Sequence, residues 1–335
     1  MTQDEIAGFW LDLIPRWALA EAIFMVADQK IADVIGDGPT SLATIAEQTG
    51  NDPTMLGRML NALAAHGIFA RIDEDSYGPT PLSTPLRSDA PGSYRPYIGL
   101  GRLVLHDTWT AMPETLRTGR TAFDIQFGAP SFEYFKQHPA KAAGFAEAMS
   151  VTTKRVEQAL IAADPFGDFD LAIDIGGSFG SLLRLLLAQR PNARGIVFDL
   201  PDTAAEAARR WADAPDADRL QAIGGSFFES VPAGGDLYLL KQILHDWTDE
   251  QSVTILKAIR AAIPAHGRVA LVEMVLPDDG SPHPGWMYDL LMMSVTGGRE
   301  RTGAQYAALL EKAGFALSNI HRTQSPMSVV EARPN

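Results

Sequence analysis

The segment covering residues 171–200 constrains the fold of this chain more than any other stretch. In it, a short apolar strand ends at a turn that contains Gly176, Gly177 and Gly180, and a leucine-rich helix follows. A second apolar strand then ends at Asp199. Glycines in such a turn let the backbone approach a ligand at the helix N-terminus, and an acid at the end of the next strand can accept hydrogen bonds from ribose hydroxyls. The segment therefore predicts an α/β fold with a nucleotide-like ligand at this turn.

Three other interpretations of the turn are open. A dinucleotide-binding fingerprint requires G-x-G-x-x-G, and Ile175 stands where its first glycine should be. Residues 176–180 also satisfy G-x-S-x-G, the nucleophile elbow of α/β-hydrolases, with Ser178 as the nucleophile. The absence of an upstream H-G-G-G segment and the helical pattern of the N-terminal half argue against a hydrolase. A turn that only packs a helix on a strand would leave Asp199 without a partner.

Composition narrows the class of protein. The chain has 335 residues, of which 46% are hydrophobic, and this length favours two domains with a substantial core. No run of 18 apolar residues and no charged-then-apolar start occurs, so we expect neither a membrane span nor a secretion signal. Cysteine is absent, which removes disulfides and thiolate chemistry and suits a cytoplasmic protein. The net charge of −13 argues against nucleic acid or an anionic membrane as a partner.

Residues 1–98 are expected to form a winged-helix domain. Apolar residues at near-helical spacing continue to a break at Gly36, two shorter helices follow, and a small hairpin over residues 68–80 completes the wing. The first 100 residues contain six cationic and thirteen acidic side chains, so this surface should repel duplex DNA. The long apolar first helix is better explained as a subunit interface, which predicts a homodimer.

The rest of the chain is expected to form a connector and a sheet domain. Residues 99–165 should be a helical connector whose aromatic and methionine side chains line a pocket for a flat apolar ligand. Residues 166–335 alternate short apolar strands with helices, which predicts a mostly parallel, doubly wound sheet. Only a short turn at residues 323–326 joins the last two strands, so they should form a hairpin and the last strand should be antiparallel.

Candidate catalytic groups follow the ends of these strands, where ligands bind in such sheets. The strand over residues 237–241 leads to His245, which stands just before the next helix. A neutral imidazole can accept a proton near pH 7 but needs a carboxylate to orient it. Glu273, inside an apolar strand, and Glu300, in a turn before another helix, are the two candidates. No histidines and acids occur at a metal-ligand spacing such as H-E-x-x-H, so we expect no metal.

Four segments of the chain, in this order, resemble the motifs of the S-adenosylmethionine-dependent O-methyltransferases. They are DIGGSFG from Asp174, FDLP from Phe198, LKxxLHDWTDE from Leu240 and GGRERT from Gly297. The most similar group holds plant caffeate and flavonoid O-methyltransferases, acetylserotonin O-methyltransferase, and bacterial enzymes that methylate polyketide and phenazine antibiotics. The resemblance covers nearly the whole chain. It implies a Rossmann-like S-adenosylmethionine-binding domain, a winged-helix dimerisation domain, and methylation of a phenolic hydroxyl on an aromatic small molecule in specialised metabolism.

The resemblance also implies roles for individual residues. His245 would be the general base, flanked by Glu273 and Glu300. The residues that would bind the cofactor are Asp174, Gly176, Gly177, Asp199, Leu200, Ser226, Phe227 and Lys241. The residues that would line the acceptor pocket are Trp109, Met149, Asp246, Asp289, Met292 and Met293. Many relatives have an aspartate where this chain has Ser226, so the bond to the adenine amino group would here be accepted by an uncharged hydroxyl.

Other functions are also compatible with these sequence features. The same fold and cofactor also serve nitrogen or carbon methylation and non-methylating reactions such as hydroxylation, decarboxylation and cyclisation. A histidine base with two glutamates favours oxygen methylation, because a phenol with a pKa of about 10 is mostly protonated at pH 7. A DNA-binding regulator that uses the winged helix and a hydrolase that uses Ser178 are the rivals from other classes.

Overall fold

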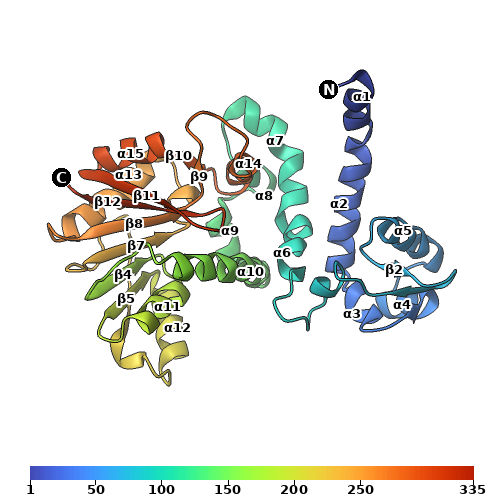
Figure 1. The fold of residues 1–335 in the computed structure, drawn as a ribbon, viewed down its shortest axis with the longest axis horizontal. Coiled ribbons are helices and arrows are strands. Elements are labelled where there is room, and N and C mark those ends of the chain that lie inside the picture. The colour runs from blue at the N-terminus through green and yellow to red at the C-terminus, as the bar shows by residue number, and fades with distance from the viewer. The chain divides into compact units, whose positions relative to one another are not determined.

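The computed structural model describes all of residues 1–335, and the chain divides into two compact units (Figure 1). The N-terminal unit comprises Met1–Pro113 and Gln126–Lys154, and the C-terminal unit comprises Glu114–Ile125 and Arg155–Asn335. The domain boundaries expected at residues 98 and 165 stay a prediction. No helix in either unit is both long and apolar enough to cross a membrane.

The N-terminal unit is mostly helical and carries one small antiparallel sheet in the order β1-β3-β2. Its strands are β1 (Thr40–Ser41), β2 (Ala70–Arg71) and β3 (Ser76–Gly78). Its helices, of which α7, α8 and α10 continue across the unit boundary, are α1 (Gln3–Leu11), α2 (Leu13–Asp28), α3 (Ile31–Ile35), α4 (Leu42–Thr49), α5 (Pro53–Ala65), η1 (Thr84–Leu86), α6 (Arg95–Leu100), η2 (Gly101–Leu105), α7 (His106–Thr118), α8 (Ala122–Phe127), α9 (Ser131–Gln137) and α10 (Pro139–Ala163).

The winged-helix arrangement predicted for this unit is confirmed, and its helices begin and end at the expected signals. The Asp52 side chain accepts a hydrogen bond from the backbone of Met55, and Pro53 occupies the first position of α5. The apolar faces of α4 and α5 pack into one core with α3 and the small sheet. The single long helix expected before Gly36 is instead three helices. Helices α2 and α3 are separated at Lys30, which adopts a left-handed backbone conformation with φ of 55°.

Helix α1 and the first half of α2 present a continuous run of exposed apolar side chains. Phe9, Trp10, Leu13, Ile14 and Trp17 are each about half exposed or more, and α1 contains no buried residue. Because single exposed apolar residues are ordinary but a run of aromatic and aliphatic side chains is not, this surface has the character of an interface.

The C-terminal unit is built on a seven-stranded sheet in the order β11-β12-β8-β7-β4-β5-β6. All its neighbouring strands are parallel except those that pair with β12, so the last strand is antiparallel, as predicted. The strands of this sheet are β4 (Leu171–Ile175), β5 (Arg194–Asp199), β6 (Leu220–Gly224), β7 (Leu237–Lys241), β8 (Arg268–Glu273), β11 (Phe315–Arg322) and β12 (Ser328–Pro334). A separate parallel pair joins β9 (Val275–Leu276) to β10 (Arg301–Thr302).

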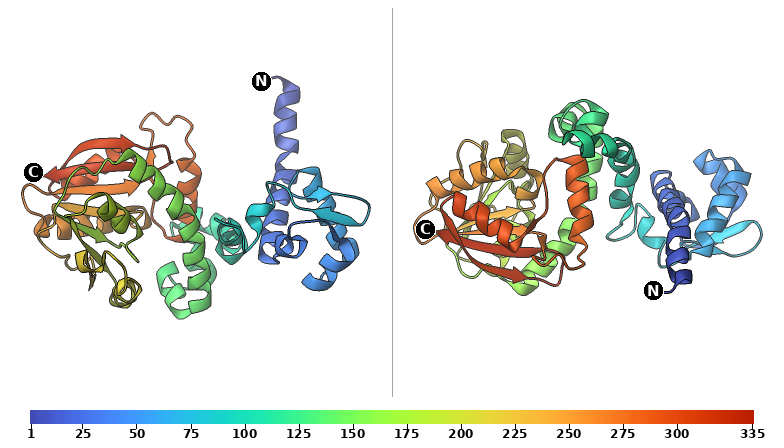
Figure 2. Two further views of the ribbon diagram at one scale, coloured as in Figure 1. Left: turned by 60° about the horizontal axis from the view of Figure 1, so that its bottom comes forward. Right: turned by 90° about the horizontal axis from the view of Figure 1, so that it is seen from above.

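Helices cover both faces of the sheet (Figure 2). Successive strand residues point to opposite faces, so that Ile173 joins one core with α13 and α15, while Ala172 joins the other with α11 and α12. The helical elements of this unit are α11 (Ser181–Gln189), α12 (Pro201–Trp211), η3 (Ala217–Arg219), η4 (Leu244–Asp246), α13 (Asp249–Ala262), α14 (Gly285–Val295) and α15 (Gly303–Lys312). Helix α14 was not predicted from the sequence.

Candidate active site

The glycine turn after β4 can be formed only by residues without side chains. Gly176 has φ of +67°, and a Cβ atom there would lie 2.5 Å from Ile243 Cδ1. A Cβ atom at Gly177 would lie 2.5 Å from Asp174 Cγ. The backbone at Gly177 therefore passes directly over Asp174, an approach that a side chain at this position would prevent.

Asp199, at the end of β5, connects this turn to the next one. Its Oδ2 accepts a hydrogen bond of 2.8 Å from the backbone N–H of Ser178, and its Oδ1 accepts one of 2.7 Å from Leu200. Burial raises the pKa of Asp199, while these backbone donors lower it. A carboxylate has about four acceptor positions, and the Thr203 side chain also hydrogen-bonds to this one, so Asp199 keeps capacity for a ribose hydroxyl of a ligand. The turn and this acid together fit a nucleoside ligand.

Three other predicted cofactor residues follow strands at the same edge of the sheet, and they differ in the contacts that they already make within the protein. Phe227 lies 3.8 Å from where a Gly176 Cβ would be, and it packs edge-to-face with Phe228 and Trp247. The Ser226 hydroxyl accepts the backbone N–H of Phe228, so it is used within its own loop. Leu200 is 62% exposed. The Ser178 hydroxyl makes no hydrogen bond to a base, which a hydrolase nucleophile would need.

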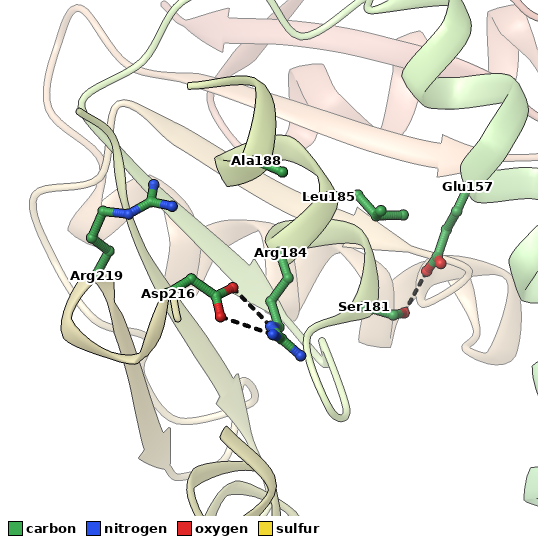
Figure 3. Close-up of a pocket in the computed structure, with 7 residues that line it drawn as sticks. All are labelled: Glu157, Ser181, Arg184, Leu185, Ala188, Asp216 and Arg219. Carbon is green, nitrogen blue, oxygen red and sulfur yellow. Dashed lines mark hydrogen bonds and ion pairs between the residues drawn. The ribbon is translucent and has the colours of Figure 1, made fainter. Parts of the chain in front are cut away.

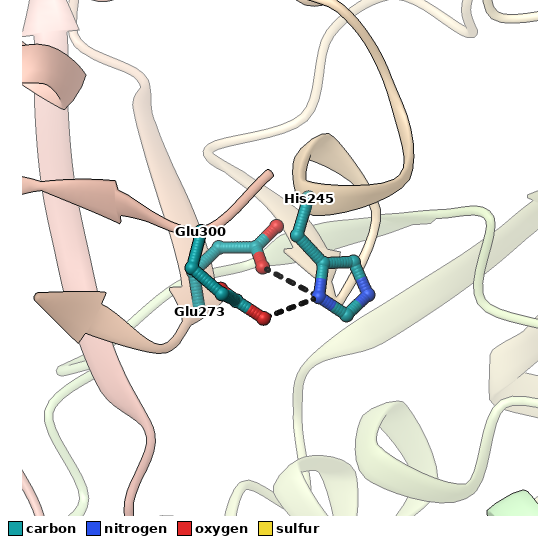
Figure 4. Close-up of side chains that lie close together, drawn as sticks. All are labelled: His245, Glu273 and Glu300. Atoms are coloured by element: carbon teal, nitrogen blue, oxygen red, sulfur yellow. Dashed lines mark hydrogen bonds and ion pairs between the residues drawn. The ribbon is translucent and has the colours of Figure 1, made fainter. Parts of the chain in front are cut away.

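His245 lies in the short helical turn η4 with its ring held by carboxylates (Figure 4). Its Nδ1 is 3.0 Å from Glu300 Oε1 and 4.0 Å from Glu273 Oε2, and the residue is only 8% exposed. A ring that donates its Nδ1–H to Glu300 leaves Nε2 as the proton acceptor. The structure thus brings together the three residues predicted to be catalytic, and Glu300 is the nearer partner.

The two glutamates hold the turn as well as the ring. Glu273 ends β8 with its side chain fully buried, and its Oε1 accepts hydrogen bonds of 3.1 and 2.9 Å from the backbone of Ile243 and Leu244. Burial raises the pKa of Glu273 to about 7. The Glu300 N–H donates to Asp289 Oδ1 at 2.8 Å, which connects α14 to the site.

The sequence predicted no role for Arg301, but in the structure this residue holds the turn that carries His245. Its side chain is fully buried and donates hydrogen bonds of 2.8 Å to the carbonyls of Leu244 and Trp247, on either side of His245. The backbone of Gly298 also packs against this turn, so closely that a Cβ atom there would lie 1.9 Å from the His245 carbonyl oxygen. The GGRERT segment therefore fixes the backbone of the histidine turn, which explains why glycine and arginine are needed there.

The charges around His245 favour its protonated form in the absence of ligands. Burial by itself lowers the pKa of His245, but Asp246, Glu273 and Glu300 together raise it to about 10. Glu273 Oε2 and Glu300 Oε2 have no hydrogen-bond partner, so a cationic ring compensates them. A neutral imidazole in this setting is a strong base whose pKa matches that of a phenol.

This electrostatic arrangement predicts a pH profile that a single substitution should move. Because only neutral His245 can accept a proton, kcat/KM for the acceptor should rise with pH towards the raised pKa. In Glu300→Gln one carboxylate is lost, the pKa of His245 falls, and the rising limb should move to lower pH by about one unit or more. Steady-state rates across pH would measure this. Glu311→Gln, an exposed glutamate on α15, should leave the limb in place. An unmoved limb in Glu300→Gln would contradict the coupling.

The residues predicted to line the acceptor pocket fall in both units. Asp289, Met292 and Met293 lie on α14 and are half-buried, and Asp246 Oδ1 is 3.7 Å from His245 Nε2. Trp109 on α7 and Met149 on α10 belong to the N-terminal unit. The assignment of all six residues to an acceptor pocket stays a prediction.

His245, Glu273 and Glu300 each place a ligand atom within 4.8 Å of the others, which is also a spacing that could hold a metal ion. The ring hydrogen bond to Glu300 and the two backbone donors to Glu273 account for the same arrangement without an ion.

The chain matches two family models. One, an O-methyltransferase domain, covers residues 109–316, and the other, an O-methyltransferase dimerisation domain, covers residues 11–89. The chain therefore belongs to the O-methyltransferase family, and it is an S-adenosylmethionine-dependent methyltransferase. The family resemblance inferred from the four sequence motifs is confirmed.

Individual relatives agree with this membership. The chain is 38% identical to a phenazine O-methyltransferase of Lysobacter antibioticus over the full length of both chains. It is 31% identical to an 8-amino-8-demethylriboflavin N,N-dimethyltransferase of Streptomyces davaonensis, which covers 94% of this chain and 92% of the relative. Its fold matches an O-methyltransferase of neocarzinostatin biosynthesis, solved with S-adenosylmethionine and a naphthoic acid, with a TM-score of 0.83, 31% identity and coverage of 94% and 96%.

Proposed function

We propose that this enzyme methylates a hydroxyl group on an aromatic small molecule of specialised metabolism, such as a precursor of an antibiotic. The observation that carries the proposal is the buried His245 ring, which Glu300 orients through Nδ1 so that Nε2 is left to accept a proton. A hydroxyl nucleophile has a proton that must be removed, and this residue can remove it.

The residues of this chain have two tasks in such a reaction. The cofactor supplies a methyl group already activated by a positively charged sulfur. The Gly176 turn and Asp199 would hold its nucleoside, which fixes the methyl group relative to the acceptor. Such positioning can contribute on the order of 7–11 kcal/mol of the barrier. His245 would take the hydroxyl proton, and Glu273 and Glu300 would stabilise the resulting imidazolium. A positioned base typically contributes roughly 10²–10⁴-fold.

The relatives support an aromatic acceptor and also supply a second candidate. Their names include a phenazine O-methyltransferase and an aminohydroxybenzoate O-methyltransferase. One relative is an N,N-dimethyltransferase that acts on an aminoriboflavin, so methylation of an aromatic amine is the second candidate. An aromatic amine is neutral at pH 7 and can attack before it loses a proton, so it needs the base less than a phenol does.

A panel of matched acceptors separates these two functions. Hydroxylated phenazines, naphthoates and benzoates would each be tested beside the analogue with an amine in place of the hydroxyl, with S-adenosylmethionine as donor. We expect a methylated product, seen by mass spectrometry together with released S-adenosylhomocysteine, only from the hydroxyl compounds. Turnover of the amine members alone would replace the proposal by nitrogen methylation. An altered product without release of S-adenosylhomocysteine would indicate a non-methylating reaction.

We further propose that the enzyme is a homodimer formed through the N-terminal unit. The match to a dimerisation domain and the exposed apolar run that includes Trp10, Ile14 and Trp17 support this assignment. Light scattering should give twice the chain mass. Trp17→Glu should lower that mass towards one chain, because it places a charge on the interface. A monomeric mass for the unaltered protein would contradict the proposal. Nucleic acid is not an expected partner, given six cations against thirteen acids in the first 100 residues.

A further inference from the structure

A group of buried charges beneath the glycine turn includes one residue to which no role has been assigned. Glu157 lies on the last turns of α10 and is 4% exposed. Its Oε1 accepts a hydrogen bond from the Ser181 hydroxyl, on the first residue of α11, and one of 2.9 Å from Lys241 Nζ (Figure 3 shows Glu157 and Ser181). Glu157 therefore connects three elements, α10, α11 and β7, at the end of β7 that faces the turn.

Glu157 also lines the pocket drawn in Figure 3. The pocket has a volume of about 490 Å³ and includes Arg184, which pairs with Asp216, and Arg219, which donates to three backbone carbonyls. The lining holds these two cations and two acids, Glu157 and Asp216, so the pocket has no net positive charge to attract an anion. What distinguishes Glu157 from the other lining residues is its contact with Lys241, which does not line the pocket.

Lys241 interacts with two acids. Glu157 Oε1 contacts its ammonium, and Asp174, directly beneath Gly177, interacts electrostatically with both Lys241 and Glu157. Burial raises the pKa of Asp174 to about 7, and the charge of Lys241 opposes that rise. The ammonium of Lys241, whose side chain is mostly but not fully buried, is stabilised by a counter-charge, and Glu157 makes the direct contact.

We propose that Glu157 is a positioning residue that neutralises Lys241, so that the turn accepts a positively charged sulfur. S-adenosylmethionine carries a sulfonium, whereas its product S-adenosylhomocysteine has a neutral thioether, and the two molecules otherwise share their polar groups. An uncompensated Lys241 would repel the sulfonium and leave the thioether almost unaffected. Glu157 thus helps to set the preference of the enzyme for its donor over its product. The inference rests on the cofactor assignment and not on the identity of the acceptor.

Calorimetry with the whole enzyme and each of the two compounds tests this inference. In Glu157→Gln the Kd for S-adenosylmethionine should rise about tenfold and that for S-adenosylhomocysteine by less than about threefold, since a lost counter-charge acts mainly on the charged ligand. Lys241→Met should move the ratio of the two Kd values in the opposite direction, towards S-adenosylmethionine. Ser181→Ala removes a hydrogen bond from Glu157 without changing any charge, so its ratio should match that of the unaltered enzyme.

A purely structural role for Glu157 would give a different pattern. In Glu157→Gln both compounds would then bind equally more weakly. The ratio of their Kd values would also not move in opposite directions in Glu157→Gln and Lys241→Met. Either result would overturn the inference. If Glu157→Gln does not fold, the ratio in Lys241→Met still decides, because an unchanged ratio there contradicts the charge argument. Failure of the unaltered enzyme to bind either compound would instead refute the cofactor assignment.

Discussion

Replacement of His245 by glutamine should lower kcat by roughly 10²-fold or more while the Kd for S-adenosylmethionine stays within about twofold. Glutamine is close to histidine in size and can still meet the Glu300 carboxylate with its amide, so the turn should keep its shape. It cannot accept a proton at neutral pH. The loss should therefore appear in the chemical step and not in cofactor binding. Single-turnover rates with a phenolic acceptor, together with calorimetry, would measure both quantities.

The acidity of the acceptor supplies an internal control for this result. A nitrophenol is largely ionised near neutral pH and needs no base, so His245→Gln should slow its methylation far less than that of an ordinary phenol. An equal loss with both acceptors would assign His245 a positioning task only. An unchanged rate with the ordinary phenol would remove the residue from the reaction.

Replacement of Asp199 by asparagine is expected to have the second-largest effect, on binding of the cofactor. The carboxylate already holds the backbone N–H groups of Ser178 and Leu200, and its remaining capacity is what ribose hydroxyls would use. Loss of charged hydrogen bonds of this kind costs about 1.5–3 kcal/mol. That corresponds to a Kd for S-adenosylmethionine raised roughly 10–100-fold. Calorimetry or equilibrium dialysis would measure the change.

Asp202→Asn is the matched control for that substitution. Asp202 is an exposed acid in the first turn of α12, only three residues from Asp199, and it should leave the Kd unchanged. The assignment of Asp199 would be wrong if the two variants bound the cofactor equally well.

Local patterns were sufficient to predict the sheet and the approach to the site. β4 is followed by Gly176, and β5 and β7 end at Asp199 and Lys241, all three of which are predicted to bind the cofactor; parallel strands bring those ends to one edge. The helix expected just after His245 is α13, which begins where the Thr248 side chain and Gln251 form reciprocal capping bonds. Such features depend on residues that are close in sequence.

The features that were missed depend on contacts between residues distant in sequence. Arg301 and Leu244 are 57 positions apart, and Glu157 and Lys241 are 84 apart, so no local spacing could pair them. The breaks between α1, α2 and α3 were missed because the apolar spacing continues across them. Helix α14 has apolar residues on all of its faces, and Asp289 is its only charged residue. It therefore has no distinct polar face, and the spacing of apolar residues gave no helical signal.

We propose that a cofactor held over the Gly176 turn gives its methyl group to an oxygen that His245 has deprotonated. The most direct test is to supply S-adenosylmethionine with a deuterium-labelled methyl group and a dihydroxylated aromatic acceptor, and to locate the label in the product by NMR. We expect the intact labelled methyl group on an oxygen, in an amount equal to the S-adenosylhomocysteine released. A label on nitrogen or carbon, or a product without the label, would contradict it.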